Sequence, residues 1–192
     1  MKVLLHTCCA ACTIAASRAL ADEGHEVTGF FYNANIHPLV EFRRRLKAMK
    51  MLQERLPLPV IYVEDYGLAE WLRCVDWRGD RRCEECYRQR LSRAAAEARA
   101  RGFPAISTTL LASTHQNQDL LRRVGAECAK AEAVEFVYRD WRPLAEEAHK
   151  EASRLRLYLQ QYCGCVFSEY ERFKDTTQHL YRGSGPLKDA GN

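Results

Sequence analysis

Short apolar segments alternate along this chain with longer segments in which apolar residues recur every three or four positions. The short segments, rich in β-branched and aromatic residues, predict strands at residues 2–6, 26–32, 60–63, 105–109 and 133–138. The longer segments predict helices at residues 14–21, 39–55, 68–74, 83–101 and 118–130. Because strands and helices alternate, we expect an α/β fold with a parallel, Rossmann-like sheet of about five strands.

The pattern changes from about residue 143. From there to residue 173 the sequence predicts helices that are broken near Gly164, with no further strand. We expect these helices to form a C-terminal cap on a single α/β catalytic domain that spans residues 1–181. Residues 182–192 contain three glycines and a proline, which predicts a flexible tail. The length of 192 residues fits one such domain.

The composition excludes several classes of protein. Hydrophobic residues make up 47% of the chain and charged residues 28%, which is typical of a globular protein and excludes a disordered or collagen-like one. No apolar run is long enough to cross a bilayer. The first six residues have the composition of a buried strand rather than of a signal peptide. We therefore expect a cytoplasmic protein that does not bind a membrane.

Basic residues are concentrated in the middle of the chain. The net charge of the whole chain is +4, but residues 41–101 contain 15 Lys or Arg against 10 Asp or Glu. This segment permits an anionic macromolecule as a partner, without requiring one.

Nine cysteines are the strongest chemical signal. Seven of them form three groups, at positions 8, 9 and 12, at 83 and 86, and at 163 and 165. In a reducing compartment, such groups indicate metal or redox chemistry rather than structural disulfides. Cys74 and Cys128 have no cysteine neighbour, and we interpret them as small apolar side chains.

The positions of the three groups favour an iron–sulfur site. Cys8 and Cys9 follow the first strand, and ligands of parallel sheets bind at the carboxyl ends of the strands. Cys83 and Cys86 share one face of a predicted helix. An iron–sulfur cluster takes four thiolates, which leaves three for a second iron or a dithiol–disulfide couple. Structural zinc is the competing interpretation, although it prefers two paired cysteine spacings.

Six motifs spread over residues 3–168 carry a resemblance to a known family. They are residues 6–12 (HTCCAAC), 32–38 (YNANIHP), 82–91 (RCEECYRQRL), 108–113 (TTLLAS), 140–143 (DWRP) and 161–168 (QYCGCVFS). Together they resemble the signature motifs of the QueH-type epoxyqueuosine reductases. Ala11, Ala34 and the pair at 114–115 replace prolines that are frequent in that family, which affects loop geometry rather than ligands.

The resemblance implies a reaction and its cofactors. These enzymes reduce the epoxide of epoxyqueuosine at the tRNA wobble position, the last step of queuosine synthesis, and they depend on an external electron donor. The family carries a [4Fe–4S] cluster and uses no cobalamin. Its sheet resembles that of PP-loop ATPases, but no glycine-rich phosphate loop follows the first strand here. Matched position by position, the cluster ligands are Cys8, Cys9, Cys83 and Cys86.

The same resemblance allows two roles for Cys12, Cys163 and Cys165. Cys163 and Cys165 match a redox-active CGC pair and are catalytic candidates. Together with Cys12, they alternatively hold a second, mononuclear iron. The sequence leaves this choice open.

Other residues of the matched motifs are candidates for proton transfer and substrate binding. His37 and Asp140 are the catalytic candidates, with His6 and Tyr87 as further proton donors. For an anticodon stem–loop carrying epoxyqueuosine, the expected contacts are Arg78, Arg81, Arg82, Tyr87, Thr108 and Thr109, with Trp71 and Trp77 as stacking surfaces and residues 43–45 as a second arginine run. A zinc-stabilised RNA-binding module and a thiol–disulfide oxidoreductase are the alternative functions.

Overall fold

A five-stranded parallel sheet forms the centre of the molecule. The computed structural model describes residues 1–76 and 81–177. The strands lie in the order β3-β2-β1-β4-β5, and every neighbouring pair is parallel. Their bounds are β1 (Lys2–His6), β2 (Glu26–Phe31), β3 (Val60–Tyr62), β4 (Ala105–Thr108) and β5 (Glu135–Phe136). The predicted α/β class with a five-stranded parallel sheet is therefore confirmed.

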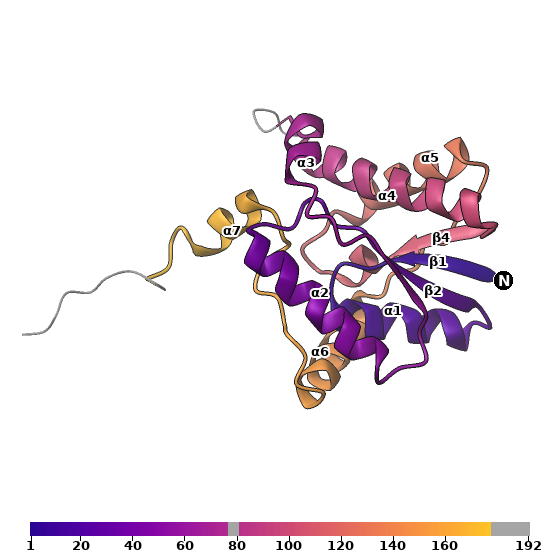
Figure 1. The fold of residues 1–192 in the computed structure, drawn as a ribbon, viewed down its shortest axis with the longest axis horizontal. Coiled ribbons are helices and arrows are strands. Elements are labelled where there is room, and N and C mark those ends of the chain that lie inside the picture. Colours follow the sequence, from indigo (N-terminus) through magenta and orange to yellow (C-terminus); the bar gives the residue numbers. More distant parts are fainter. Residues whose placement is uncertain (77–80, 178–192) are drawn as a thin grey trace, which may run out of the picture.

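Helices cover both faces of this sheet (Figure 1). One layer contains α1 (Ala10–Asp22), α2 (Leu39–Gln53) and α6 (Ala145–Arg154), and the other contains α3 (Leu68–Cys74), α4 (Arg82–Arg101) and α5 (Gln118–Ala131). The central strand β1 is apolar on both sides because each side meets a helical layer. Val3, Leu4 and Leu5 are all fully buried, and Leu4 packs with the alanines of α4.

The order of the strands locates a crevice. The chain runs from β1 outward to β2 and β3, and then crosses to β4 on the other side of β1. In parallel sheets, ligands bind where the strand order reverses, beyond the carboxyl ends. His6 ends β1 at this point, and its ring contacts the carbonyl of Tyr32 at 3.1 Å and the Thr108 hydroxyl at 2.9 Å. His6 therefore links the end of β1 to Tyr32, which follows β2, and to Thr108, which ends β4.

Three local differences from the sequence-based prediction affect the site. Helix α1 begins at Ala10 rather than 14, with Cys9 at its N-cap, so Cys12 lies within the first turn. Strand β5 covers only Glu135–Phe136, and the backbone adopts a left-handed conformation at Ala133, where φ is +54°, just before the strand begins. The expected break near Gly164 is much longer, since residues 155–165 form neither helix nor strand.

The C-terminal part caps the carboxyl edge of the sheet. After α6, the irregular segment leads to α7 (Val166–Phe173), which lies beyond the ends of the strands near the starts of α2 and α3 (Figure 1). The predicted tail at 182–192 lies outside the described residues. None of the helices in the described ranges has the length and apolar character that would let it span a bilayer.

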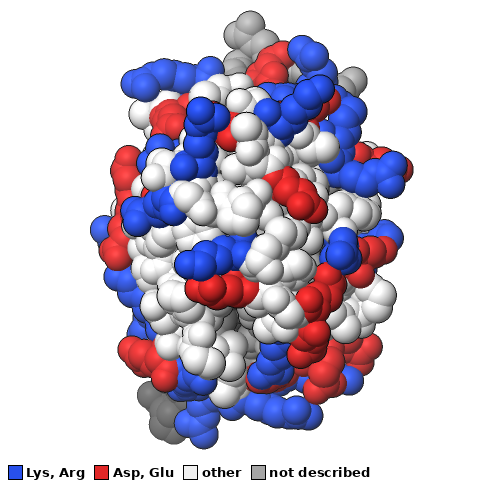
Figure 2. Space-filling model, turned by 90° about the vertical axis from the view of Figure 1, so that its right-hand side faces the viewer, with Lys and Arg blue, Asp and Glu red and all other residues white. Residues whose placement is uncertain are grey.

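The opposite edge of the sheet has no distinctive charge pattern. Figure 2 shows the face at the amino ends of the strands, where basic and acidic side chains are interspersed. Such a mixed surface offers no extended positive field for an anionic partner.

The packing of α5 on the sheet depends on one glycine. A Cβ atom added to Gly125 would lie 2.4 Å from the ring of Phe136, the last residue of β5. We expect Gly125→Ala to lower the free energy of unfolding by about 1–3 kcal/mol, the usual cost of overpacking. Urea denaturation measures this. Gly102→Ala is the comparison variant. A Cβ at position 102 meets nothing within 4 Å, but φ there is +74°, so this substitution introduces backbone strain without overpacking. Equal stability of Gly125→Ala and the unaltered protein would contradict this reading.

Candidate metal and redox centre

Two adjoining pockets lie at the carboxyl edge, and thiols line both. The larger, of about 290 Å³, is the Cys83 pocket, and it contains Cys83, Cys86, Cys163 and Cys165. The smaller, of about 150 Å³, is the Cys8 pocket, and it contains Cys8, Cys12 and Cys163. The pockets share one wall, formed by His115, Gln116, Gln161, Tyr162 and Cys163.

The first cysteine group is held at the turn between β1 and α1. The backbone N–H of Cys8 donates to the Thr109 hydroxyl at 3.2 Å, and the Cys8 thiol lies 3.4 Å from the same oxygen. The amide of Gln160 donates to the Cys9 sulfur at 3.0 Å. Because Thr109 follows β4 and Gln160 belongs to the C-terminal segment, Cys8 and Cys9 are anchored by parts of the chain distant in sequence.

The second group occupies the first turns of α4. Cys83 is exposed and Cys86 is buried, and both sulfurs line the Cys83 pocket because residues three apart share a helix face. Tyr87 is also buried here, and its hydroxyl donates to the Gln116 side-chain oxygen at 2.7 Å. The Gln116 amide in turn donates to the Cys163 sulfur at 3.4 Å. Helix α4 is thus linked to the third cysteine group through one glutamine.

The third group depends on a glycine. Gly164 has φ of +148°, and a Cβ there would lie 3.1 Å from the side chain of Ile36. Its carbonyl accepts from the His37 backbone N–H at 2.7 Å, and its own N–H donates to the Ser168 hydroxyl at 3.1 Å. A residue with a side chain fits neither the backbone conformation nor the space. The glycine lets Cys163 and Cys165 flank a backbone that is fixed on both sides.

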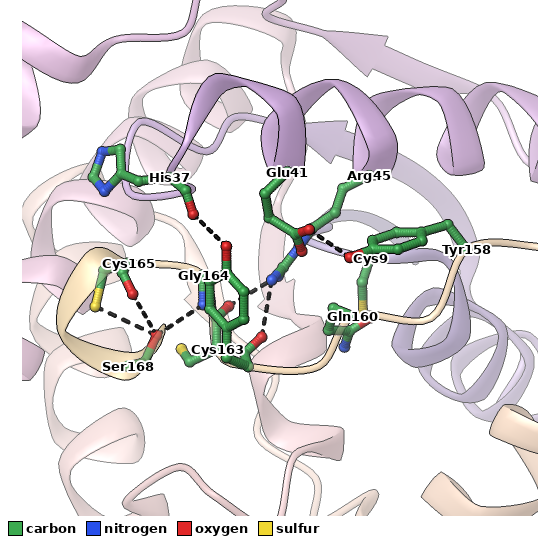
Figure 3. A network of polar contacts seen from close by, with 11 residues as sticks. Cys9, His37, Glu41, Arg45, Tyr158, Gln160, Cys163, Gly164, Cys165 and Ser168 are labelled. Atoms are coloured by element: carbon green, nitrogen blue, oxygen red, sulfur yellow. Dashed lines mark hydrogen bonds and ion pairs between the residues drawn. The ribbon is translucent and has the colours of Figure 1, made fainter. Parts of the chain in front are cut away.

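A buried ion pair fixes the position of this CGC loop (Figure 3). Arg45 of α2 is 1% exposed and donates to the carbonyls of Cys163 at 2.8 Å and of Tyr162 at 2.9 Å. Its Nε donates to Glu41 at 2.7 Å, and the Tyr158 hydroxyl donates to the other oxygen of that carboxylate. The guanidinium therefore has both a counterion and two carbonyl acceptors.

Burial keeps the thiols protonated in the absence of a ligand. It raises the pKa of Cys86 to about 12, and it also raises the pKa of Cys83 and Cys163. A hydrogen bond with Cys12, together with burial, raises the pKa of Cys9 to about 12. Metal ligation needs thiolates, so binding of a metal here would release protons.

The arrangement of the thiols suits a metal group of a particular kind. Among the described residues, no three His, Cys, Asp or Glu side chains converge tightly enough to hold one metal ion. In a [4Fe–4S] cluster, each cysteine thiolate binds a different iron. The four cysteine sulfurs therefore surround the cluster and do not converge on one metal atom. The buried guanidinium of Arg90 lines the Cys83 pocket, and its Nη1 has no partner in the described chain. A thiol-lined pocket with an unpaired buried cation fits an anionic group.

The structure brings some of the sequence-predicted residues to these pockets. Arg82 and Tyr87 line the Cys83 pocket, and Thr109 lines the Cys8 pocket. Arg82 also forms an ion pair with Glu171 and packs over the Phe167 ring. Arg81 is exposed at the N-cap of α4. Arg78 and Trp77 lie outside the described residues.

Other predicted residues are engaged elsewhere. The Thr108 hydroxyl contacts His6 and accepts from the Leu110 N–H, and it lines neither pocket. Asp140 is exposed, pairs with Arg142 and caps its N–H at 3.1 Å, also outside both pockets. Burial lowers the pKa of His6 to about 3, and both of its ring nitrogens are hydrogen-bonded, so it is a structural side chain.

The backbone of His37 is hydrogen-bonded to the CGC loop, and its ring packs away from both pockets. Its ring lies against Trp71, with centroids 4.5 Å apart, and against Tyr66. Its Nε2 donates to the Ala34 carbonyl at 3.1 Å, and burial lowers its pKa. Trp71 is buried, packs between this ring and Phe167, and lines the Cys83 pocket.

Sequence reasoning overlooked three buried polar residues. Arg45 belongs to the run at 43–45, for which the sequence predicts a tRNA-binding surface; Arg43 and Arg44 are exposed, but Arg45 is buried. Asn35 and Arg90 fall inside the matched motifs, and both line the Cys83 pocket. The amide of Asn35 is 1% exposed and has no hydrogen-bond partner within the described part of the chain. Asn35 lies in the motif at residues 32–38 and Arg90 in the cysteine-containing motif at residues 82–91, and these positions are the only sequence signal that points to the two residues.

The fold and these pockets define an α/β protein with a thiol-lined site at the carboxyl edge of its sheet. A family model described as "Epoxyqueuosine reductase QueH" matches residues 3–171. A protein of that name from Dehalococcoides mccartyi is 40% identical over 173 residues, which cover 90% of this chain and 94% of the relative. One from Thermotoga maritima is 36% identical over 180 residues, covering 88% and 91%. The chain belongs to the QueH family of epoxyqueuosine reductases.

The buried ion pair beneath the CGC loop gives a testable consequence. We expect Arg45→Met to destabilise the protein by about 3–5 kcal/mol, because it leaves Glu41 buried without a counterion. Urea denaturation measures this, with Arg43→Met, an exposed position on the same helix, as the control. A loss of less than about 1 kcal/mol would show that the CGC loop does not need this anchor.

Proposed function

We propose that this protein reduces the epoxide of epoxyqueuosine in tRNA to the alkene of queuosine. The proposal rests on membership of the family together with one observation: cysteines from three distant segments line two adjoining pockets at the carboxyl edge. Both C–O bonds of the epoxide break and a C=C bond forms. Two electrons enter from an external one-electron donor, and two protons leave with the oxygen as water.

We propose that a [4Fe–4S] cluster occupies this region. When bound, it supplies single electrons and an electrophilic iron. The ligand set expected from the resemblance is Cys8, Cys9, Cys83 and Cys86. The pockets also support a second set, in which Cys163 and Cys165 join Cys83 and Cys86, because those four line one pocket. In the first case, Cys163 and Cys165 are free to act as a dithiol; in the second, they are ligands.

A further mononuclear iron with Cys12, Cys163 and Cys165 has weaker support. Cys12 and Cys163 line the Cys8 pocket, whereas Cys165 lines only the Cys83 pocket. Its sulfur instead contacts the Ser168 hydroxyl at 3.6 Å. An iron held by these three would require the CGC loop to rearrange.

The chain's own residues supply proton and substrate contacts in this proposal. Tyr87 carries a phenolic proton, and burial raises its pKa so that it stays protonated. Through Gln116 this phenol is connected to Cys163. Arg82 and Arg172 line the Cys83 pocket, and Arg81 is exposed nearby in sequence, so phosphates of an anticodon loop would meet cations here. The modified base would leave the loop and enter the pocket.

Nucleoside analysis tests the proposed reaction. The protein is reconstituted anaerobically with iron and sulfide and incubated with epoxyqueuosine-containing tRNA and dithionite. We expect the modified nucleoside to lose the mass of one oxygen, as measured by mass spectrometry. Colourless protein with stoichiometric zinc and no conversion would instead support an RNA-binding module. Conversion by protein that holds no iron would support a thiol–disulfide oxidoreductase centred on the CGC loop.

Single cysteine substitutions separate the two ligand sets. Under the first set, Cys8→Ser greatly reduces cluster loading and Cys165→Ser leaves loading intact. The second set predicts the reverse. Iron and acid-labile sulfide per chain are the measurement, and Cys74→Ser, at an exposed cysteine outside the three groups, is the control. Full loading of all three variants would contradict both sets.

A further inference from the structure

Arg90 is a buried cation in contact with one of the site thiols. It lies two turns into α4, is 1% exposed, and reaches back toward the start of the helix. Its Nε donates to the Cys86 carbonyl at 3.1 Å, and its Nη2 donates to the Cys86 sulfur at 3.3 Å. The remaining nitrogen, Nη1, has no partner among the described residues, and the side chain lines the Cys83 pocket.

The charge of Arg90 has no carboxylate counterpart within the described ranges. Arg45, the other fully buried arginine of the site, is paired with Glu41 at 2.7 Å. The groups that interact electrostatically with Arg90 are instead the thiols of Cys86, Cys163 and Cys8, one from each cysteine group, and the Tyr87 phenol. A guanidinium does not lose its proton in a protein, so its charge is fixed.

A fixed buried charge of this kind is costly unless an anion compensates it. Neutral thiols do not compensate it, whereas thiolates that hold an iron–sulfur group do, and that group becomes more negative by one charge with every electron it accepts. Attraction between Arg90 and the group is therefore stronger in the reduced state. Because the site is buried, water and salt screen this attraction less than at the surface.

We propose that Arg90 is a positioning residue that raises the reduction potential of the iron–sulfur group ligated by Cys86. This inference rests on the proposed cofactor and adds a role for a side chain outside the ligand set. Its effect is on the ease with which the group accepts an electron from the external donor. We expect a smaller effect from Arg45 because the Glu41 carboxylate offsets its charge.

The test is a redox titration of the loaded protein with two substitutions at position 90. Arg90→Met removes the charge and keeps an extended side chain, while Arg90→Lys keeps the charge. Arg93→Met, one turn further along α4 at an exposed position, is the matched control for the same substitution. Reduced and oxidised fractions are measured by absorbance and electron paramagnetic resonance at a series of fixed potentials.

We expect the ratio of reduced to oxidised Arg90→Met protein to be at least tenfold below that of the unaltered protein at the same potential. For a one-electron couple, this corresponds to a shift of about 59 mV to lower potential. Arg90→Lys should stay within about threefold of the unaltered protein, and Arg93→Met should titrate identically to it.

The outcomes separate this inference from the proposed cofactor. If the unaltered protein binds no iron, the cofactor proposal fails. If Arg90→Met loads fully and titrates like the unaltered protein, the cofactor stands and the role of Arg90 is overturned. Should Arg90→Met fail to load, Arg90→Gln, which keeps hydrogen-bond donors without charge, is titrated instead. Loading by Arg90→Lys but by neither neutral variant would show that the charge retains the group rather than tunes it, which also overturns the proposal.

Discussion

The arrangement of the site depends on the anchoring of an irregular segment by a buried arginine. Residues 155–165 form neither helix nor strand, so their backbone carbonyls lack the partners that regular structure provides. Arg45 donates to two of them, and Glu41 compensates its charge. Cys163 belongs to this anchored segment and lines both pockets. The position of Cys163 between the other two cysteine groups therefore depends on the Arg45–Glu41 ion pair of α2.

Two buried arginines give the site an unequal balance of charge. The Glu41 carboxylate neutralises Arg45, but no carboxylate of the described chain pairs with Arg90. Burial meanwhile raises the pKa of Cys86 and Cys163, so these two thiols are neutral until a ligand takes their protons. The protein without a metal thus keeps one buried positive charge beside the Cys83 pocket. An anionic thiolate-bound group relieves that cost, and this is the physical reason to favour it over a neutral small molecule.

The sequence was sufficient for the sheet and for the grouping of the cysteines. Hydrophobic periodicity located all five strands, because β1 is buried on both faces and its neighbours are apolar. It did not locate the start of α1, since Ala10 and Ala11 carry no periodic signal, nor the length of the irregular segment after α6. The run of arginines at residues 43–45 predicts a solvated surface, whereas Arg45 is buried. Only the tertiary fold brings the carbonyls of Tyr162 and Cys163 to it.

Topology explains why cysteines so far apart in sequence meet. Cys8 leaves the central strand at the point where the strand order reverses, and Thr109 leaves the adjacent strand β4 beside it. Helix α4 packs against β1 and β4 and starts at this same edge, which delivers Cys83 and Cys86. The parallel sheet therefore fixes the first two groups without any bound metal. The CGC loop alone lacks such support. Its conformation depends instead on Gly164, on the Ser168 hydroxyl and on the Arg45 guanidinium. Changes at the loop itself should therefore alter the site while the sheet stays intact.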